Sequence, residues 1–158
     1  MDDATWLDER EERVWRAFLA LGRAVDVAVE QQLTAEGLST AEYAVLASLS
    51  EAPQGAVRAR ELAREIGWDS SRLAHQLRRM EKRGLLTRGQ CPDDARGTMV
   101  HLTTEGRAAL TRAAPGHVRT VRAHFVDLLT AEEQTSLAAV LERLRAASGD
   151  EAPGRLPG

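Results

Sequence analysis

The sequence predicts a mainly α-helical fold with one small β-hairpin. Apolar residues recur at steps of three, four or seven over residues 7–33, and a helical pattern returns after residue 104. Two short helical runs meet at Gly67, and two short β-like runs follow at residues 85–88 and 98–102. With 158 residues, 43% of them hydrophobic and 28% charged, the chain is the size and composition of one globular domain.

The first predicted helix covers residues 7–33 and carries its apolar residues on one face. Gly37 ends it. Ser39 and Glu42 then have the spacing of a capping box, in which the two side chains satisfy free backbone amides at the start of a helix. We therefore expect a second helix from this box to about Ser50.

A tight glycine turn is predicted between the third and fourth helices. Val57 fits a short edge strand, and the third helix follows it and ends at Gly67. Asp69 or Ser70 can cap the fourth helix, which is expected to continue to Arg83. Two short helices joined by a tight turn form a helix-turn-helix pattern.

The loop of residues 89–97 is a candidate wing, because a predicted strand lies on each side of it. A helical pattern then runs from Thr104 to about Leu129. Pro115 and Gly116 should kink or divide that helix, since proline cannot donate to the preceding turn. The whole pattern predicts a winged helix-turn-helix between long N- and C-terminal helices.

The C-terminal part contains a second capping box and a short tail. Thr130 and Glu133 have the capping-box spacing, and a last helix follows them. Residues 149–158 are rich in glycine and proline and are predicted to be disordered. We therefore assign residues 1–148 to a single domain.

Several classes of protein are excluded by the same sequence. No apolar run is long enough to span a bilayer, and the acidic start Met1-Asp2-Asp3 differs from a signal peptide, so we expect a cytoplasmic protein with no membrane partner. Cys91 is the only cysteine, which rules out an internal disulfide. No Ser-His-Asp, paired-carboxylate or phosphate-loop arrangement can be placed on one site, so we predict no enzyme activity and no cofactor.

Positive charge is concentrated in the middle of an acidic chain. The formal net charge is -3, but residues 58–88 hold nine Lys or Arg against four acids. A basic block in an otherwise acidic chain indicates that one patch contacts a polyanion. Arg58 and Arg60 lie at the start of the third predicted helix and belong to this block.

The fourth helix has two faces at about 100° per residue. Its apolar stripe consists of Leu73, Leu77 and Met80. The stripe predicted to face away from the core consists of Arg72, His75, Gln76 and Arg79. Arg and Gln can form paired hydrogen bonds with guanine and adenine edges in the major groove of DNA. The plain alternative is the solvated face of an amphipathic helix, but the preceding turn and the following strand-loop-strand favour DNA binding.

Two further pairs complete the predicted DNA contacts. Ser70 and Ser71 lie at the amino end of the fourth helix, where hydroxyls and free amides can hold a phosphate. In the wing, Asp94 can orient the guanidinium of Arg96 for entry into a minor groove. A weak surface ion pair is the alternative for this second pair. A protein-interaction module is a further alternative for the whole chain, although the fourth helix lacks exposed apolar anchors.

In its middle part the chain resembles the multiple antibiotic resistance regulator (MarR) family of transcription regulators. The resemblance covers about residues 58–110 and rests on four segments in the order that the family shows. These are Glu61-Leu62-Ala63-Arg64-Glu65-Ile66-Gly67, Arg72 through Leu86, Asp94-Ala95-Arg96-Gly97, and Leu102-Thr103-Thr104-Glu105-Gly106. The wing departs from the family pattern, since Cys91 replaces an acid and Ala95 an arginine.

The resemblance implies a homodimer that binds a palindromic operator in double-stranded DNA, and we expect a repressor, with an activator as the alternative. Residues 38–103 would form the winged DNA-binding part, and residues 6–34 and 104–147 the dimerisation helices. The apolar faces of these helices independently need burial beyond a small winged core. By the same resemblance, the fourth-helix residues named above match recognition-helix positions, and Asp94 and Arg96 match the wing pair.

Relatives in the family often release DNA when a small aromatic anion binds between the dimerisation helices and the winged part. Trp15, Phe18 and Tyr43 are candidate residues for such an effector site, and plain core packing is the alternative. The effector itself, the operator and the regulated genes cannot be derived from the sequence. A regulator without an effector therefore stays open as an alternative.

Control of DNA binding by oxidation or by a metal ion is less favoured than control by a small ligand or regulation without an effector. Cys91 has no second cysteine to resolve an oxidised thiol, so an incidental thiol is preferred over a redox-sensing regulator. His117 and His124 are seven residues apart, too far for an ordinary metal clamp on one helix, and no metal site is predicted.

Overall fold

The computed structural model describes residues 6–91 and 94–148, with only the backbone of residues 94–96. The predicted disordered tail, residues 149–158, lies outside the described residues. The elements follow in the order α1 (Glu9–Ala35), α2 (Thr40–Glu51), the 3-10 turn η1 (Pro53–Gly55), β1 (Ala56–Arg58), α3 (Ala59–Glu65), α4 (Ser70–Lys82), β2 (Leu86–Cys91), β3 (Asp94–Leu102), α5 (Thr104–His124), the 3-10 turn η2 (Val126–Leu128) and α6 (Ala131–Ala147). The predicted fold class, mainly α with a small antiparallel sheet, is confirmed.

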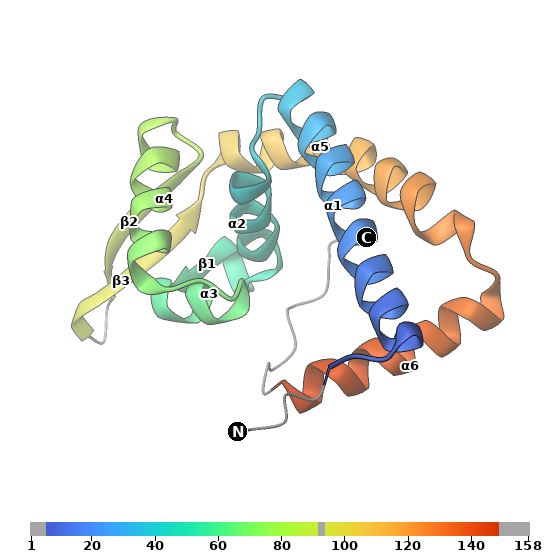
Figure 1. Ribbon diagram of the computed structural model, residues 1–158. Coiled ribbons are helices and arrows are strands. Elements are labelled where there is room, and N and C mark those ends of the chain that lie inside the picture. The colour runs from blue at the N-terminus through green and yellow to red at the C-terminus, as the bar shows by residue number, and fades with distance from the viewer. Residues whose placement is uncertain (1–5, 92–93, 149–158) are drawn as a thin grey trace, which may run out of the picture.

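The sheet has the strand order β1-β3-β2, and both pairings are antiparallel. Val57 pairs with Val100, so the predicted edge strand is confirmed. On the other side of β3, Leu86 pairs with Leu102. The sheet and helices α2, α3 and α4 lie together at one end of the molecule (Figure 1).

A single apolar core holds this end together. Leucines from α2, α3 and α4 meet strand residues and the first half of α5. The largest fully buried side chains are Leu33, Leu46, Leu49, Leu62, Leu73, Leu77, Met80, Leu86, Val45 and Val100. Burying one such side chain stabilises the fold by about 1.5–3 kcal/mol, so this cluster fixes the orientation of α4 relative to the sheet.

The predicted capping boxes begin two of the helices. Ser39 and Glu42 exchange hydrogen bonds at the start of α2. Thr130 and Glu133 do the same at α6, and both predictions are confirmed. A third box, formed by Asp8 and Glu11, begins α1 and was not predicted.

Two predicted boundaries are wrong. The strands were expected to end at Arg88 and to begin again at Thr98, but β2 and β3 extend to Cys91 and from Asp94, because backbone pairing continues through a register shift near Gln90. The predicted helix to about Leu129 ends earlier, since α5 runs from Thr104 to His124 as one helix that Pro115 does not divide, and a kink at Pro115 stays a prediction.

The long helices α1 and α6 contribute little to the core of the protomer. Only Val29 and Leu33 of α1 are buried, and no residue of α6 is buried. Helix α6 and the amino-terminal part of α1 lie at the far end of the molecule from α4, with α5 running from the sheet towards them (Figure 1). No helix in the described part of the chain is both long and apolar enough to span a bilayer.

Candidate nucleic-acid interface

The turn between α3 and α4 is closed by local hydrogen bonds. Gly67 has a φ of +67°, in the left-handed region that favours glycine. The amide of Trp68 donates to the carbonyl of Ala63 at 2.8 Å, and that of Gly67 to Arg64 at 3.3 Å, which is the Schellman pattern. Asp69 then caps α4 by accepting the amide of Arg72 at 2.9 Å. This turn presents the amino end of α4 to solvent.

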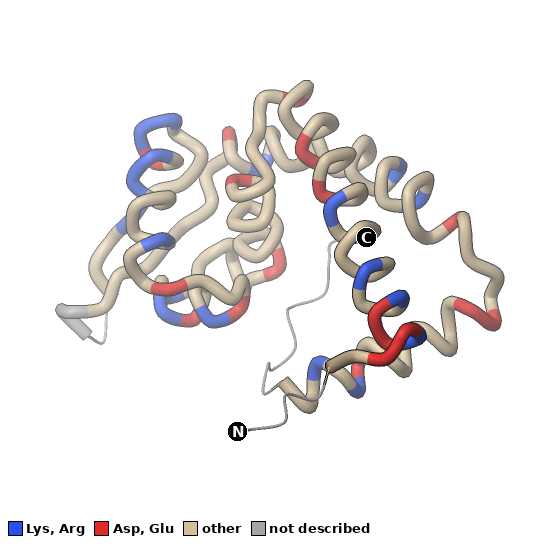
Figure 2. Tube along the Cα trace, viewed as in Figure 1, with Lys and Arg blue, Asp and Glu red and all other residues tan. Residues whose placement is uncertain are grey.

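Most of the predicted DNA-facing side chains of α4 are exposed. Leu73, Leu77 and Met80 are buried, as the predicted apolar stripe requires. The exposed predicted residues are Ser70, Ser71, Arg72, His75 and Arg79. Lys and Arg lie along α4, mainly towards its carboxyl end, whereas α3 carries both basic and acidic residues and acids mark the starts of α1 and α6 (Figure 2).

The predicted outward orientation of Gln76 is wrong. Gln76 is only 7% exposed, and its Nε2 has no hydrogen-bond partner within the described residues. At about 100° per residue, Gln76 lies nearer to Met80 than to Arg79 around the helix, so it falls on the edge of the apolar stripe. In this conformation Gln76 does not present its amide to a base edge.

The arginines before α4 are placed differently from each other. Arg60 is exposed on α3. Arg58 is partly buried, pairs with Met99 across the sheet and precedes α3 as its N-cap residue. Arg60 is therefore exposed beside α4 and can contact the same ligand, whereas Arg58 is part of the sheet that supports α3 and α4.

The wing is the β2–β3 hairpin. The side chains of Asp94 and Arg96 lie outside the described residues, so their predicted pairing is untested. Cys91 is buried at the end of β2 and pairs with Asp94 in the sheet register. Burial of the thiol limits its access to oxidants, in line with the preference for an incidental cysteine.

Two ion pairs that the sequence did not reveal fix the carboxyl end of α4. Arg83 donates to the carboxylate of Glu42 at 2.5 Å and to the carbonyl of Gly37 at 2.8 Å. Arg88 donates to the carboxylate of Glu81 through Nε at 3.0 Å and through Nη2 at 2.6 Å. The charge count of the basic block included Arg83 and Arg88, but both are paired with carboxylates, so α4 depends less on them for attracting a polyanion.

The pKa values of the two carboxylates follow from these partners. Burial alone would raise the pKa of Glu42, but hydrogen bonds from the Ser39 amide, Arg83 and the Ser39 hydroxyl outweigh it and hold the pKa below its usual value. The hydrogen bond from Arg88 lowers the pKa of Glu81. Both acids are therefore charged and paired at neutral pH.

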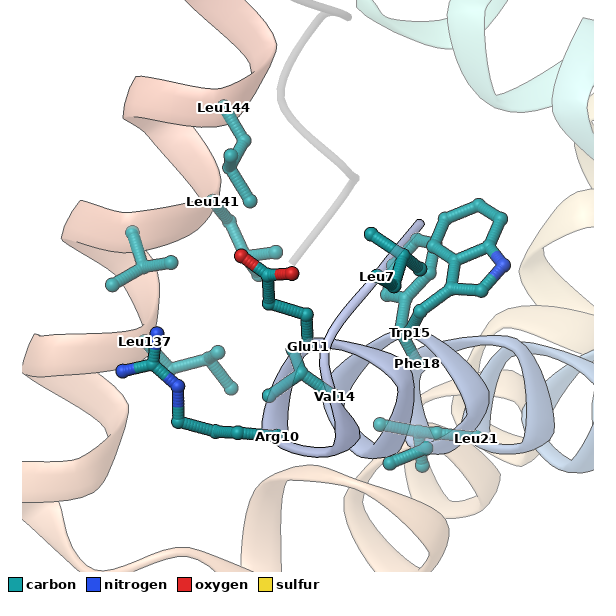
Figure 3. A pocket seen from close by; sticks show the side chains of 12 residues that line it. Leu7, Arg10, Glu11, Val14, Trp15, Phe18, Leu21, Leu137, Leu141 and Leu144 are labelled. Atoms are coloured by element: carbon teal, nitrogen blue, oxygen red, sulfur yellow. The ribbon is translucent and has the colours of Figure 1, made fainter. Parts of the chain in front are cut away.

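The three candidate effector residues occupy two separate places. The rings of Trp15 and Phe18 stack with their centroids 5.9 Å apart. They line a cavity of about 950 Å³ between α1 and α6, which faces the aliphatic side chains of α6 (Figure 3). Tyr43 does not line this cavity; it is 5% exposed and packs on His117 at 4.5 Å between ring centroids.

The two α5 histidines have separate surroundings. Burial lowers the pKa of His117, whose ring faces Tyr43. The Nδ1 atom of His124 lies 3.0 Å from the carbonyl oxygen of Thr120. Among the described residues, no group of three His, Cys, Asp or Glu side chains is placed to hold a metal ion.

Comparison with known proteins places this geometry among DNA-binding regulators. A family model described as "MarR family" matches residues 38–98. The crystal structure of Sco3205, a MarR family transcriptional regulator from Streptomyces coelicolor in complex with DNA, has a TM-score of 0.88 and 36% identity, covering 99% of this chain and 98% of that one. AbsC, a MarR family regulator from the same organism, has a TM-score of 0.90 and 34% identity over 94% of this chain and 100% of its own.

A curated relative gives the same picture from sequence alone. The "HTH-type transcriptional repressor Mb2911" of Mycobacterium bovis is 30% identical over 124 residues, which is 78% of this chain and 87% of the relative. The match therefore extends beyond the winged part into the flanking helices.

Proposed function

The chain belongs to the MarR family of transcriptional regulators, which are DNA-binding proteins and not enzymes, and we propose that it is a homodimeric repressor that binds a palindromic operator and responds to a small ligand. The observation that carries the DNA-binding part is the exposed row of Arg72, His75 and Arg79 on a helix whose other face is locked in the core. The cytoplasmic location stays a prediction that accompanies this role.

The proposed contacts divide into base readers and phosphate anchors. Arg72, His75 and Arg79 are the base readers, because an exposed helix face of this kind fits the major groove. Ser70 and Ser71, with Arg60 on the neighbouring helix, are the phosphate anchors. Arg96, oriented by Asp94, remains a minor-groove contact predicted from the sequence.

Replacing Arg79 with Ala tests base reading. We expect a loss of about 1–3 kcal/mol of operator affinity and a relaxed preference at one base pair, because a paired hydrogen bond to a base edge is removed. Affinity is measured by fluorescence anisotropy against the operator and single-base variants of it. DNA flanking this protein's own gene, or a duplex selected from a random pool, supplies the operator.

Arg78→Ala is the matched control for that test. Arg78 is exposed on the same helix but lies about 100° around it from Arg79, so the control removes the same charge from another face. We expect the control to weaken binding by a similar factor on every sequence and to leave base preference intact. Identical specificity profiles for the two variants would refute the assignment of Arg79.

The proposal of a homodimer is supported by the exposed apolar faces of α1 and α6. No residue of the 17-residue helix α6 is buried in the protomer, although most helical stability in proteins comes from packing an apolar face. A second copy of the chain has the complementary face by symmetry, and two winged parts related by a two-fold axis match a palindromic site. Repression is supported by the name of the mycobacterial relative.

Ligand control is supported by the apolar cavity between α1 and α6. The cavity contains the stacked Trp15 and Phe18, and Arg10 on its rim can pair with an anion. Glu11, also on the rim, is held in the capping box by the amide of Asp8 at 2.9 Å. The cavity lies on the face proposed for dimerisation, so a bound ligand would act next to the partner.

Salicylate is expected to raise the melting temperature of the protein. A ligand that binds only the folded state stabilises it by about 2.7 kcal/mol at a hundred times its Kd. The melting temperature is measured by differential scanning calorimetry at fixed protein concentration. Benzyl alcohol is the uncharged control, and Trp15→Leu should reduce the shift. Equal shifts with both compounds, or none with salicylate, would contradict this part of the proposal.

A further inference from the structure

Trp68 is held firmly in the turn that precedes α4. Its amide is fixed by the Schellman hydrogen bond to Ala63, and its partly buried side chain packs against the apolar core. The left-handed Gly67 before it and the capping Asp69 after it fix the path of the chain on both sides. The indole therefore belongs to the rigid part of the fold, although it lies beside the exposed amino end of α4.

The guanidinium of Arg72 lies over the face of this indole. Its central carbon is 4.3 Å from the ring centroid, within the range of a cation–π contact. The backbone of Arg72 is fixed as well, because its amide donates to Asp69. The side chain is otherwise exposed, at the end of α4 that a recognition helix directs at base edges.

Stacking on a ring leaves the donors of an arginine free. The guanidinium groups of Arg83 and Arg88 already donate hydrogen bonds to carboxylates and, for Arg83, to a carbonyl. Arg72 is ion-paired with none of the described carboxylates, and a ring contacts the face of the guanidinium and not its N–H groups. The guanidinium of Arg72 is thus oriented by the ring, and its N–H groups can still donate hydrogen bonds in the guanidinium plane.

We propose that Trp68 is a positioning residue that holds Arg72 ready to donate to a base edge in the operator's major groove. The proposal rests on the proposed DNA-binding function and adds a specificity determinant outside α4. Its physical basis is conformational entropy: an arginine already restricted by a ring loses less freedom when it forms hydrogen bonds with a base.

Two substitutions of Trp68 separate the ring face from plain packing. Trp68→Leu keeps an apolar side chain against the core and removes the ring, whereas Trp68→Phe keeps a ring of weaker cation affinity. We expect Trp68→Leu to weaken operator binding about 2- to 10-fold, the factor that follows from freeing one long side chain. Trp68→Phe should recover part of that loss. Melting temperatures of both variants show whether the fold is intact.

A double-mutant cycle with Arg72→Ala tests whether Trp68 acts through Arg72. In the Arg72→Ala background, Trp68→Leu should change operator affinity less than 2-fold, since nothing remains to be positioned. The base pair whose preference is relaxed should be the same for Trp68→Leu and Arg72→Ala. Additive losses would overturn the proposal, as would equal weakening on all sequences, which would indicate a phosphate contact.

Operator binding by the wild-type protein distinguishes a failure of this inference from a failure of the proposed function. Salt-sensitive, sequence-preferring binding by wild-type protein, together with an additive cycle, removes only the role of Trp68. Absence of such binding by the wild type removes the proposed function and this inference with it.

Discussion

Leu141→Glu is expected to turn the proposed dimer into a monomer and to reduce operator affinity by about 100-fold or more. Leu141 is 41% exposed in the isolated protomer and lines the apolar face between α1 and α6. Removing a carboxylate from water at such an interface costs several kcal/mol. Separated protomers then lose the gain from engaging two half-sites at once, which is typically about 10²–10⁴. Analytical ultracentrifugation measures the mass, and fluorescence anisotropy measures operator binding.

Ala139→Glu is the control for this prediction. Ala139 is exposed on the same helix and lies about 160° around it from Leu141, so it adds the same charge on the opposite face. The control should remain dimeric and bind the operator normally. A Leu141→Glu protein that sediments as a dimer would show that α6 does not form the interface.

Gly106→Ala is expected to destabilise the protein by about 3 kcal/mol, the upper part of the range for overfilling a packed site. A Cβ at Gly106 would overlap the carbonyl oxygen of Leu85 and lie 2.9 Å from Cδ1 of Leu102. The surrounding backbone cannot move aside easily, since Thr103 caps α5 and donates from its hydroxyl to the Gly84 carbonyl. Urea unfolding at fixed protein concentration measures the loss.

Gly116→Ala is the comparison within the same helix. There the added Cβ would meet the amide end of Gln32, a flexible side chain that can turn away. Alanine also improves a helix interior by about 0.5–1 kcal/mol relative to glycine, so the net change should be small. A loss at Gly116 as large as that at Gly106 would show that the close approach to the Leu85 backbone is not the cause.

Local chemistry made much of the fold predictable. The capping boxes at Ser39 and Thr130, the turn at Gly67 and the apolar stripe of α4 all depend on residues within a few positions of each other, and all were read correctly from the sequence. The edge strand at Val57 was predicted for the same reason, from a β-branched residue after a turn.

Interactions between distant segments were not predictable in the same way. Arg83 and Glu42 are 41 positions apart, and no pattern in either segment indicates their pairing. Gln76 was grouped with the outward stripe on the helical wheel, but its position at the border of the two stripes left its burial to be decided by packing, and the structure buries it. The stacking of Arg72 on Trp68 spans only one turn, but it joins a helix to the turn before it, which helical periodicity does not describe.

The absence of any buried residue in α6 of the protomer has a consequence for how the regulator would respond to its own abundance. If α6 is buried only by a second copy, its ordering and the assembly of the dimer are one event, and dilution reverses both. Below the dissociation constant of the dimer, operator occupancy then rises with the square of the protomer concentration. A modest fall in synthesis would therefore release the operator more sharply than it would for a monomeric repressor.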